Sequence, residues 1–524
     1  MGIFQRIFKR NKNRETVFQG HTEYLRKFQL SKNIDDNRNR LLDIMNNSFD
    51  IKSREFNIGG TSLRSAVVYI ENLVDEPEVM EHILKPLILE SVELISHAKK
   101  SEILDIIKDS IISIGDIEDV FTFDEIVLGI LSGDTFLCIE GHDRGLLIKI
   151  REYEGKPFSI PETEPSVKGP KEGLVETLKR NIGFIRKRVR DPNLTMETFM
   201  IGRRTKTDLV MTYIKGIADP DLVEDVRKKL KEIDIDGTVA AIEIGNFMVD
   251  RPRSIFPLIQ VTERVDKLVA GLLQGRVAVI MNSAPECIIV PATLPILMQS
   301  VDDYYESWVA VTLIRATRYL GLFISTLFPS LYIALTSFNP GMLPTKLVLS
   351  ITGSRVGVPF PAIIEALLMV FTLELLHEAG IRLPNVVGQA VAIVGGLVIG
   401  QSAVQAGIVS PIMVIIISIT ALSAYQIPDY SLSLTTRILR IPFMALASVL
   451  GSFGVAIGLL FLIAYLTSLK SFGYRYLSPI SPFSLSDFKD TIFKSPRAAN
   501  TKRPEFLNTQ DVVRAKNTES GNKK

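Results

Sequence analysis

The stretch VVGQAVAIVGGLVIGQSAVQAG, residues 386–407, decides the fold class of the carboxyl-terminal half of the chain. It is apolar enough to lie in lipid, yet it contains five glycines and three glutamines. Small residues allow helices to approach closely in a membrane, where association depends on packing and interhelical hydrogen bonds. Amide groups in hydrocarbon cost free energy unless they find a hydrogen-bond partner. We therefore predict a membrane helix with one packing face and one polar face.

Placing this stretch on a helix at about 100° per residue separates the two faces. The packing face is formed by small residues, namely Gly388, Ala392, Gly395, Gly396 and Ala403. The opposite side carries Val394, Val398, Gln401 and Gln405. That side has two interpretations. The four residues line a pore, in which the valines form a constriction that gates by dewetting, or the glutamines bond another helix of the same subunit.

Further apolar stretches surround this one, and each is long enough to cross a bilayer, which takes about 20 helical residues. We predict a transmembrane domain over 301–470, with spans at 319–338, 358–377, 386–406, 408–427 and 441–466. Five spans would leave the two ends of this domain on opposite sides of the membrane. Because the basic tail argues against that, we predict that 341–357, which contains Lys346 and Arg355, enters the membrane as a re-entrant element.

Charged residues occur within or beside the predicted spans, and intramembrane charge is costly enough to suggest function. These intramembrane polar candidates are Glu365, Asp429, Arg315 and Arg318. For the two arginines, an interfacial helix with snorkelling side chains is the favoured interpretation. For Glu365 an ion pair is the alternative to a functional role. Glu374 and His377 form a single ExxH pair, whereas a carboxylate-bridged metal centre needs two, so we predict no metal ligands and no cofactor.

The first 300 residues alternate between helix-like and strand-like patterns, which predicts α/β structure. A linker with four prolines divides this region. The predicted organisation is a basic flexible amino terminus (1–32), a cytosolic α/β subdomain (33–150), the linker (151–171), a second α/β subdomain (172–300), the all-α transmembrane domain and a basic flexible tail (471–524). The basic run around Arg186 is interpreted as a solvated helix face rather than a phosphate site.

Composition excludes several classes of protein. The formal net charge of +2 argues against nucleic-acid binding. Cys138 and Cys287 stand in no metal-binding or disulfide spacing, and we expect both to be buried. No P-loop, GxSxG or HExxH motif occurs, so no catalytic residue is assigned and an enzyme is not indicated.

Several segments together, in their order along the chain, resemble the A subunit of GerA-type spore germination receptors over roughly residues 130–470. The segments are EPSVKGPKEGLVETLKRNIGFIRKRVRDPNL, GRRTKTDLVMTYIKGIADP, GRVAVIMNSAPECIIVP with VDDYY, SRVGVPFPAIIEAL, the stretch quoted first, and AYQIPDYSLSLTTRILR. Lys168 and Leu174 stand where the family usually has Arg and Phe.

The resemblance implies a multi-pass protein of the spore inner membrane with a cytosolic amino-terminal domain. It also implies partners, namely a transporter-like B subunit and a lipoprotein C subunit. By the same resemblance, the A subunit would form a homo-oligomer, a pentamer, that releases monovalent cations when nutrients are sensed. With the resemblance, the pore interpretation of Val398 and its neighbours is preferred. One alternative is a stage V sporulation AF-type paralogue that amplifies germination. The other is a secondary solute transporter, but the sequence shows no pair of corresponding interrupted helices, which the inverted repeats of such transporters would predict.

Overall fold

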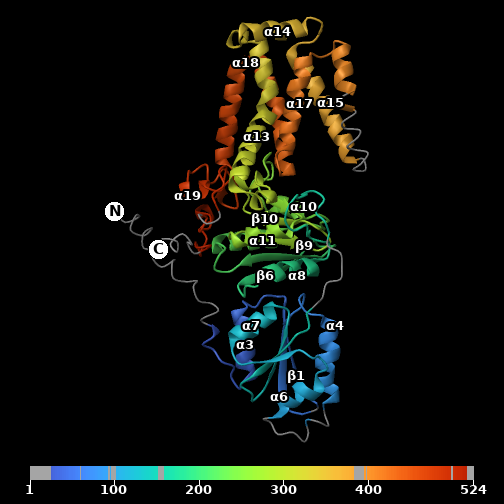
Figure 1. Cartoon of the computed structure of the whole chain (residues 1–524), viewed down its shortest axis with the longest axis vertical. Coiled ribbons are helices and arrows are strands. Elements are labelled where there is room, and N and C mark those ends of the chain that lie inside the picture. The colour runs from blue at the N-terminus through green and yellow to red at the C-terminus, as the bar shows by residue number, and fades with distance from the viewer. Residues whose placement is uncertain are drawn as a thin grey trace, which may run out of the picture. The chain divides into compact units, whose positions relative to one another are not determined.

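The computed structural model describes residues 25–59, 61–91, 95, 102–151, 159–382, 395–396, 398–496 and 500–515. The chain divides into two compact units (Figure 1). The first unit falls within residues 1–252, 259–291 and 497–524, and the second comprises 253–258 and 292–496. The expected class, two mixed α/β subdomains followed by a helical region, is confirmed.

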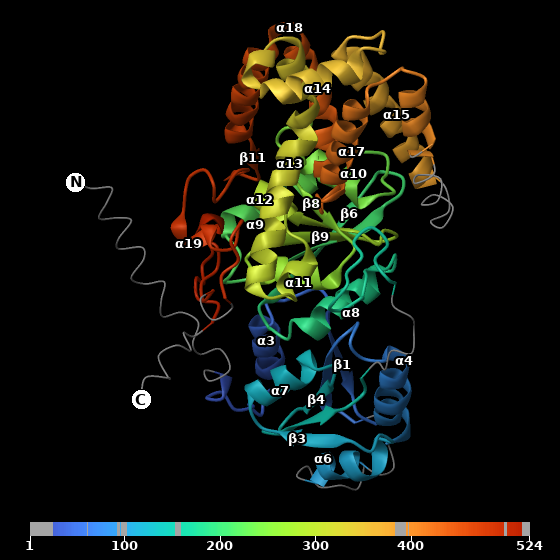
Figure 2. The same ribbon diagram turned by 45° about the horizontal axis from the view of Figure 1, so that its top comes forward.

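The first subdomain is a five-stranded antiparallel sheet in the order β1-β2-β4-β5-β3. Helices cover both faces, with α3 and α7 on one and α4 on the other (Figures 1 and 2). Alternating residues of β2 serve the two cores, because successive side chains of a strand point to opposite faces. The elements are α3 (Ile34–Ile44), β1 (Ile51–Asn57), β2 (Arg64–Ile70), α4 (Glu76–Val79), α6 (Ile103–Ile106), β3 (Ile117–Val120), α7 (Phe123–Leu131), β4 (Thr135–Ile139) and β5 (Gly145–Ile148).

The second subdomain has the same architecture, and its strand order is β6-β7-β9-β10-β8. One core lies between this sheet and helices α8 and α11. Asp219 caps α9. The elements are α8 (Leu178–Arg188), β6 (Leu194–Ile201), β7 (Thr207–Ile214), α9 (Pro220–Glu232), α10 (Ala241–Met248), β8 (Gln260–Thr262), α11 (Val265–Leu273), β9 (Val277–Met281) and β10 (Cys287–Val290).

The two subdomains are copies of one fold, which the sequence analysis did not detect. Residues 123–148 align with 265–290 without a gap, helix for helix and strand for strand. Strand registers agree, since Ala66 pairs with Cys138 in the first sheet and Val210 pairs with Ile280 in the second. The turn after the helix has the same backbone in both copies, with φ of +96° at Gly133 and +93° at Gly275. Only glycine adopts such φ values without strain, which explains why it recurs.

The segment expected to be a linker is held against the second copy by Arg264, which is buried. Its guanidinium donates to the carbonyl oxygens of Glu164 and Pro170, at 3.1 and 2.6 Å, and to Ser166 Oγ at 2.9 Å. The EPSVKGP motif is therefore an ordered loop bound to the sheet edge rather than a free connection. The region that connects the two copies is correspondingly shorter than predicted.

Both ends of the described chain depart from the flexible termini that the sequence predicts. Leu25 and Leu30 lie in the core of the first copy. Residues 500–515 pack on the second copy, where Gln510 N donates to Ile217 O at 3.1 Å and Arg503 Nε donates to Leu273 O at 2.8 Å. The tail therefore returns from the helical unit to complete the second α/β copy.

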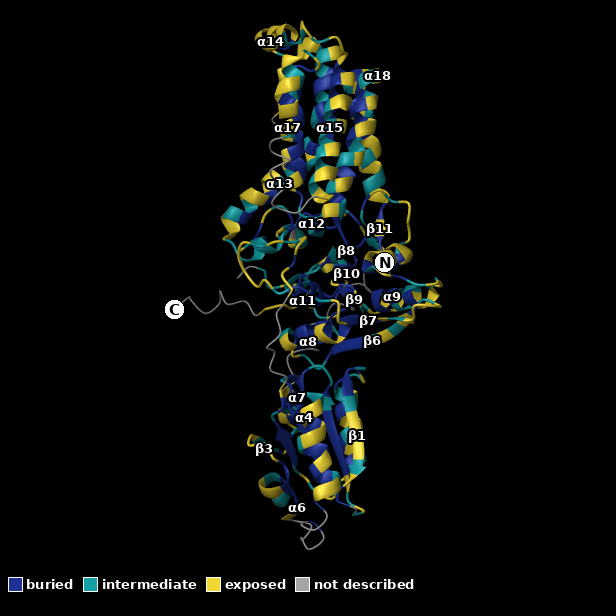
Figure 3. Ribbon diagram, turned by 90° about the vertical axis from the view of Figure 1, so that its right-hand side faces the viewer, coloured by how far each residue is buried: buried dark blue, intermediate teal, exposed yellow. Residues whose placement is uncertain are grey.

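The second unit is mostly helical, and its helices carry many exposed residues (Figure 3), among them many large apolar ones. By length and composition, α13 and α18 are each able to cross a membrane. Residues 398–405, within the stretch quoted first, are also helical. The elements are α12 (Leu294–Leu297), α13 (Trp308–Ser337), α14 (Thr345–Arg355), α15 (Ala362–Arg382), α17 (Pro411–Tyr425), α18 (Tyr430–Ser468), β11 (Lys470–Ser471), β12 (Tyr474–Arg475) and α19 (Leu485–Phe488).

Helix α18 reverses direction at Gly451, where φ is +61° and ψ is −142°. Its two arms lie side by side, because a Cβ added at Gly454 would lie 2.2 Å from Leu446 O and one at Gly458 would lie 2.8 Å from Phe443 Cε1. The structure therefore has a helical hairpin where the sequence analysis expected one helix over 441–466. A single glycine does not interrupt the hydropathy of an apolar stretch, so hydropathy alone does not reveal that the helix reverses there.

Chain segments gather at two opposite ends of this bundle. At one end Asn339 Oδ1 accepts from Ser452 Oγ at 2.9 Å, next to the reversal of α18. At the other end Arg315, near the start of α13, bonds Asp490 beyond the end of α18. Helix α14 lies across the first of these ends (Figure 1) and buries only Ile351. It therefore differs from the re-entrant element predicted for 341–357, which needs burial against protein.

Candidate functional site in the helical unit

A buried charge cluster forms where α13 begins. Asp303 Oδ2 accepts from Arg315 Nε at 2.9 Å and from Arg318 Nη1 at 2.8 Å. Arg315 also donates to Asp490 Oδ1 at 2.9 Å. Both Asp303 and Arg315 are about 2% exposed or less. The arginines thus differ from the snorkelling residues expected, and the Asp303 that pairs with them comes from the VDDYY motif.

A second ion pair lies at the opposite end of the bundle. Glu365 is fully buried, and its Oε1 accepts from Arg355 Nε at 3.1 Å. Its Oε2 accepts from the backbone N–H of Ser410 at 3.0 Å, and Ser410 caps α17. A carboxylate at a helix amino terminus is favoured by the exposed N–H groups and the helix dipole. Glu365 therefore joins α14, α15 and α17.

The other polar residues considered in the sequence cap α18 or link α15 to α17 and α18. Asp429 Oδ1 accepts from Leu432 N at 2.9 Å and caps α18. Glu374 pairs with Arg437, whose Nε lies 3.1 Å from Glu374 Oε1. The ring of His377 bonds the hydroxyl of Tyr425 at 2.9 Å, so the ExxH residues each have a protein partner on another helix.

The helix quoted first is described in part, and Gly388, Ala392 and Val394 lie outside the described residues. Gly395 packs on α15, because an added Cβ would lie 2.9 Å from Leu376 Cδ2. Val398 is 52% exposed, and the side chains of Gln401 and Gln405 are also exposed.

The small residues of that helix divide between contact and exposure. Gly400 is buried and faces Val414 of α17, at 3.5 Å from an added Cβ, although the sequence analysis did not select it. Gly396 is exposed and Ala403 is partly exposed. Within the subunit, packing therefore uses Gly395 and Gly400, and Val398, Gln401 and Gln405 stay uncovered.

Sequence reasoning missed Arg440, a fully buried residue of α18. Its Nε donates to the carbonyl oxygen of Ser325 on α13 at 3.0 Å. The signal that could have found it is Pro329, four residues after Ser325. A proline inside a helix has no N–H to donate to the carbonyl four residues earlier, so that oxygen needs another partner.

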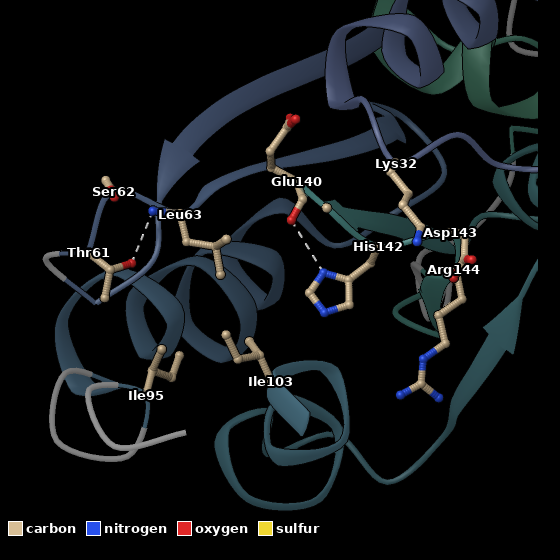
Figure 4. A pocket seen from close by; sticks show the side chains of 11 residues that line it. Lys32, Thr61, Ser62, Leu63, Ile95, Ile103, Glu140, His142, Asp143 and Arg144 are labelled. Atoms are coloured by element: carbon tan, nitrogen blue, oxygen red, sulfur yellow. Dashed lines mark hydrogen bonds between the residues drawn. The ribbon is translucent and has the colours of Figure 1, made fainter. Parts of the chain in front are cut away.

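A pocket of about 650 Å³ lies apart from these residues, in the first α/β copy (Figure 4). Two of its charged side chains, Glu140 and Arg144, have protein partners. Glu140 Oε2 accepts from Ile34 N at 3.1 Å, and Arg144 donates to Asp105 Oδ1 at 2.7 Å. His142 Nδ1 lies 3.3 Å from Glu140 O.

The arrangement defines a class of protein in which a duplicated α/β domain is joined to a bundle of apolar helices with buried ion pairs. Residues 39–506 match the family described as Bacillus/Clostridium GerA spore germination protein, and the chain belongs to that family.

Relatives match over most of their length. The chain is 38% identical to an uncharacterized membrane protein, YfkQ, of Bacillus subtilis over 91% of each chain. It is 37% identical to spore germination protein KA of the same organism, over 93% of this chain and 88% of that protein. The solved amino-terminal domain of the A subunit of the Bacillus megaterium spore germinant receptor GerK3 is 30% identical, with a TM-score of 0.41, and covers 51% of this chain and 98% of its own.

Proposed function

We propose that the chain is the A subunit of a nutrient germinant receptor in the spore inner membrane, and that its helical unit assembles with further copies into an ion channel. The first part of the proposal rests on family membership and on the relatives named above. Partners would be the transporter-like B subunit and the lipoprotein C subunit of such receptors. The channel would release monovalent cations at the start of germination.

The observation that carries the channel is the exposure of Gln401 and Gln405. Among the described residues neither amide has a hydrogen-bond partner, and in hydrocarbon such groups would cost several kcal/mol. We propose that water or another subunit satisfies them. Val398 lies on the same side of the helix, which suits a narrow apolar ring in a water-filled path. The alternative of glutamines bonded within the subunit has no support from the described contacts.

The helical hairpin of α18 determines how many times the chain would cross the membrane. Crossings by α13, α15, the helix of 398–405, α17 and the two arms of α18 would make six, an even number. An even number returns residues after 470 to the side on which α13 begins. The contact between Arg315 and Asp490 supports this, since it joins the chain before the first crossing to the chain after the last. No re-entrant element is then needed.

Reconstitution of the full-length protein in potassium-loaded liposomes tests the channel. We expect potassium to flow down its gradient without stoichiometric movement of a solute. Obligatory coupled uptake of a solute would overturn the proposal in favour of a transporter. Cysteine labelling in sealed vesicles tests the topology, because the native Cys138 and Cys287 are both buried. Ser486→Cys and Met342→Cys should react from opposite faces, and reaction from one face would contradict six crossings.

A further inference from the structure

Arg440, Ser325 and Pro329 form a contact between α18 and α13 that has a specific physical cause. Pro329 is buried inside α13 and leaves the carbonyl of Ser325 without its usual helical donor. Arg440 Nε supplies the missing hydrogen bond at 3.0 Å. Helices bend at proline because this bond is absent. The arginine therefore holds α13 at the one point where its backbone is free to bend.

The same arginine is incompletely satisfied. Its Nη1 and Nη2 are buried and have no hydrogen-bond partner among the described residues. A buried cation with unpaired donors is costly, because it has lost its hydration without gaining a full set of hydrogen bonds. The observed state thus leaves a strong donor available for a second arrangement of the bundle.

The acceptor for a second arrangement is close by. Arg437 precedes Arg440 by one helical turn and holds Glu374 of α15. The charge of Glu374 also acts on Arg440. Residues three apart on a helix are neighbours on its surface and differ by about 4.5 Å along the axis. A shift of α18 by one turn would therefore present Arg440 to Glu374 in place of Arg437. Shifts of one turn between two packed arrangements are a known form of switching.

We infer that Arg440 switches partners when the bundle changes state. In the resting state it holds the free carbonyl of Ser325 and so fixes the bend of α13 at Pro329. In the second state it pairs with Glu374, Arg437 gives up that carboxylate, and α13 is released to move. The inference rests on the proposed channel, since release of α13 would be the movement that opens the path beside Val398.

Pro329→Ala is the first test in full-length protein in potassium-loaded liposomes. Alanine supplies an N–H that competes with Arg440 for Ser325 O, and this competition favours the pairing of Arg440 with Glu374. We expect the basal potassium leak to rise at least tenfold. Adding Arg440→Gln or Glu374→Gln should return the leak to the level of the unchanged protein, because the second state then lacks its ion pair. Arg382→Gln, an exposed substitution at the end of α15, is the matched control and should leave the leak of Pro329→Ala unchanged.

A purely structural role for Arg440 predicts a different pattern. Each substitution would then add its own destabilisation, and Arg440→Gln would increase the leak of Pro329→Ala or leave it unaltered. Either result overturns the inference.

Disulfide formation gives a readout that does not depend on conduction. Val370→Cys and Met444→Cys lie in one core cluster, one helical turn from Glu374 and Arg440, and leave both charged residues in place. The rate at which this pair crosslinks should change in the Pro329→Ala background, and adding Glu374→Gln should restore the original rate. If no variant conducts but the crosslinking changes in this way, the proposed channel fails and the switch stands. If the protein conducts but the crosslinking does not change, the switch fails alone.

Discussion

Asn37 and Asn181 make the same pair of hydrogen bonds in the two α/β copies. Asn37 Oδ1 accepts from Ser31 N at 2.8 Å and Asn37 Nδ2 donates to Ser31 O at 2.6 Å. Asn181 Oδ1 accepts from Val175 N at 2.8 Å and its Nδ2 donates to Val175 O at 2.6 Å. Each side chain imitates a strand partner for the backbone that enters α3 or α8. The duplication therefore extends to side chains that hold the same turn.

Replacing either asparagine by alanine should destabilise the protein to a similar extent. Asn37→Ala and Asn181→Ala each remove two hydrogen bonds that a buried side chain makes to a part-buried backbone segment, and we expect a loss of about 2 kcal/mol. Thermal unfolding of the full-length protein in detergent measures this. Asn39→Ala is the control, because Asn39 is exposed on the same helix as Asn37 and should cost less than about 0.5 kcal/mol. Equal effects of Asn39→Ala and Asn37→Ala would contradict the prediction.

Asp50 and Arg186 form a fully buried ion pair between the copies, with Asp50 Oδ2 2.7 Å from Arg186 Nε. Burial raises the pKa of the Asp50 carboxyl, but the charge and hydrogen bonds of Arg186 outweigh this, so the pKa falls below its usual 3.8. A lowered pKa in the folded state stabilises the fold above the unfolded pKa, and this stability is lost as the pH falls through the folded pKa. We therefore expect acidification below about pH 4 to weaken the contact between the copies.

Asp50→Asn tests this assignment. The substitution leaves the Arg186 charge unpaired and should cost about 3 kcal/mol at neutral pH. The difference in unfolding free energy between this variant and the unchanged protein should shrink as the pH falls through the Asp50 titration. A difference that stays constant down to pH 2 would show that the pair does not titrate in this way.

How much of the structure the sequence could predict depends on how far along the chain each pattern extends. Hydropathy and periodicity identified the apolar helices and the α/β class, because both act within a few turns or strands. Arg186 read as part of a solvated basic face, although Asp50, its partner, is 136 residues away in the chain. Arg315 was predicted to be interfacial although Asp303 is only 12 residues away, because the segment of Asp490, which also binds it, is 175 residues away. A buried charge can be recognised only together with its partner, and a single sequence does not reveal distant partners.

The duplication was missed for a related physical reason. Strands and core helices require apolar side chains of suitable size rather than particular residues, so two copies can diverge until few identities remain. What persists is set by backbone geometry and hydrogen bonding, as at Gly133 and Gly275, whose φ is positive, and at Asn37 and Asn181. Such positions are too sparse to stand out unless the two sheets are compared.

Val398→Ala should raise the basal ion leak if this valine narrows the path. The side chain is 52% exposed within the subunit, so shortening it creates no internal cavity and should leave thermal stability unchanged within about 0.5 kcal/mol. Potassium efflux from liposomes without nutrient should increase severalfold, since a wider apolar ring is wetted more easily. Val356→Ala is the matched control, because Val356 is 83% exposed beyond α14. If substitutions of Val398, Gln401 and Gln405 all leave the leak unchanged, this face of the helix does not line the pore.

Gly451→Ala should disrupt the hairpin that sets the number of crossings. Gly451 has a positive φ, which costs a residue with a Cβ about 1–2 kcal/mol, and an added Cβ would also lie 2.8 Å from Phe338 Cβ. We expect a combined loss of at least about 2 kcal/mol, seen as a lower midpoint of thermal unfolding in detergent. Gly341→Ala is the control, since a Cβ there meets nothing within 4 Å. Similar midpoints for the two variants would indicate that α18 does not reverse at Gly451, and the even number of crossings would lose its structural basis.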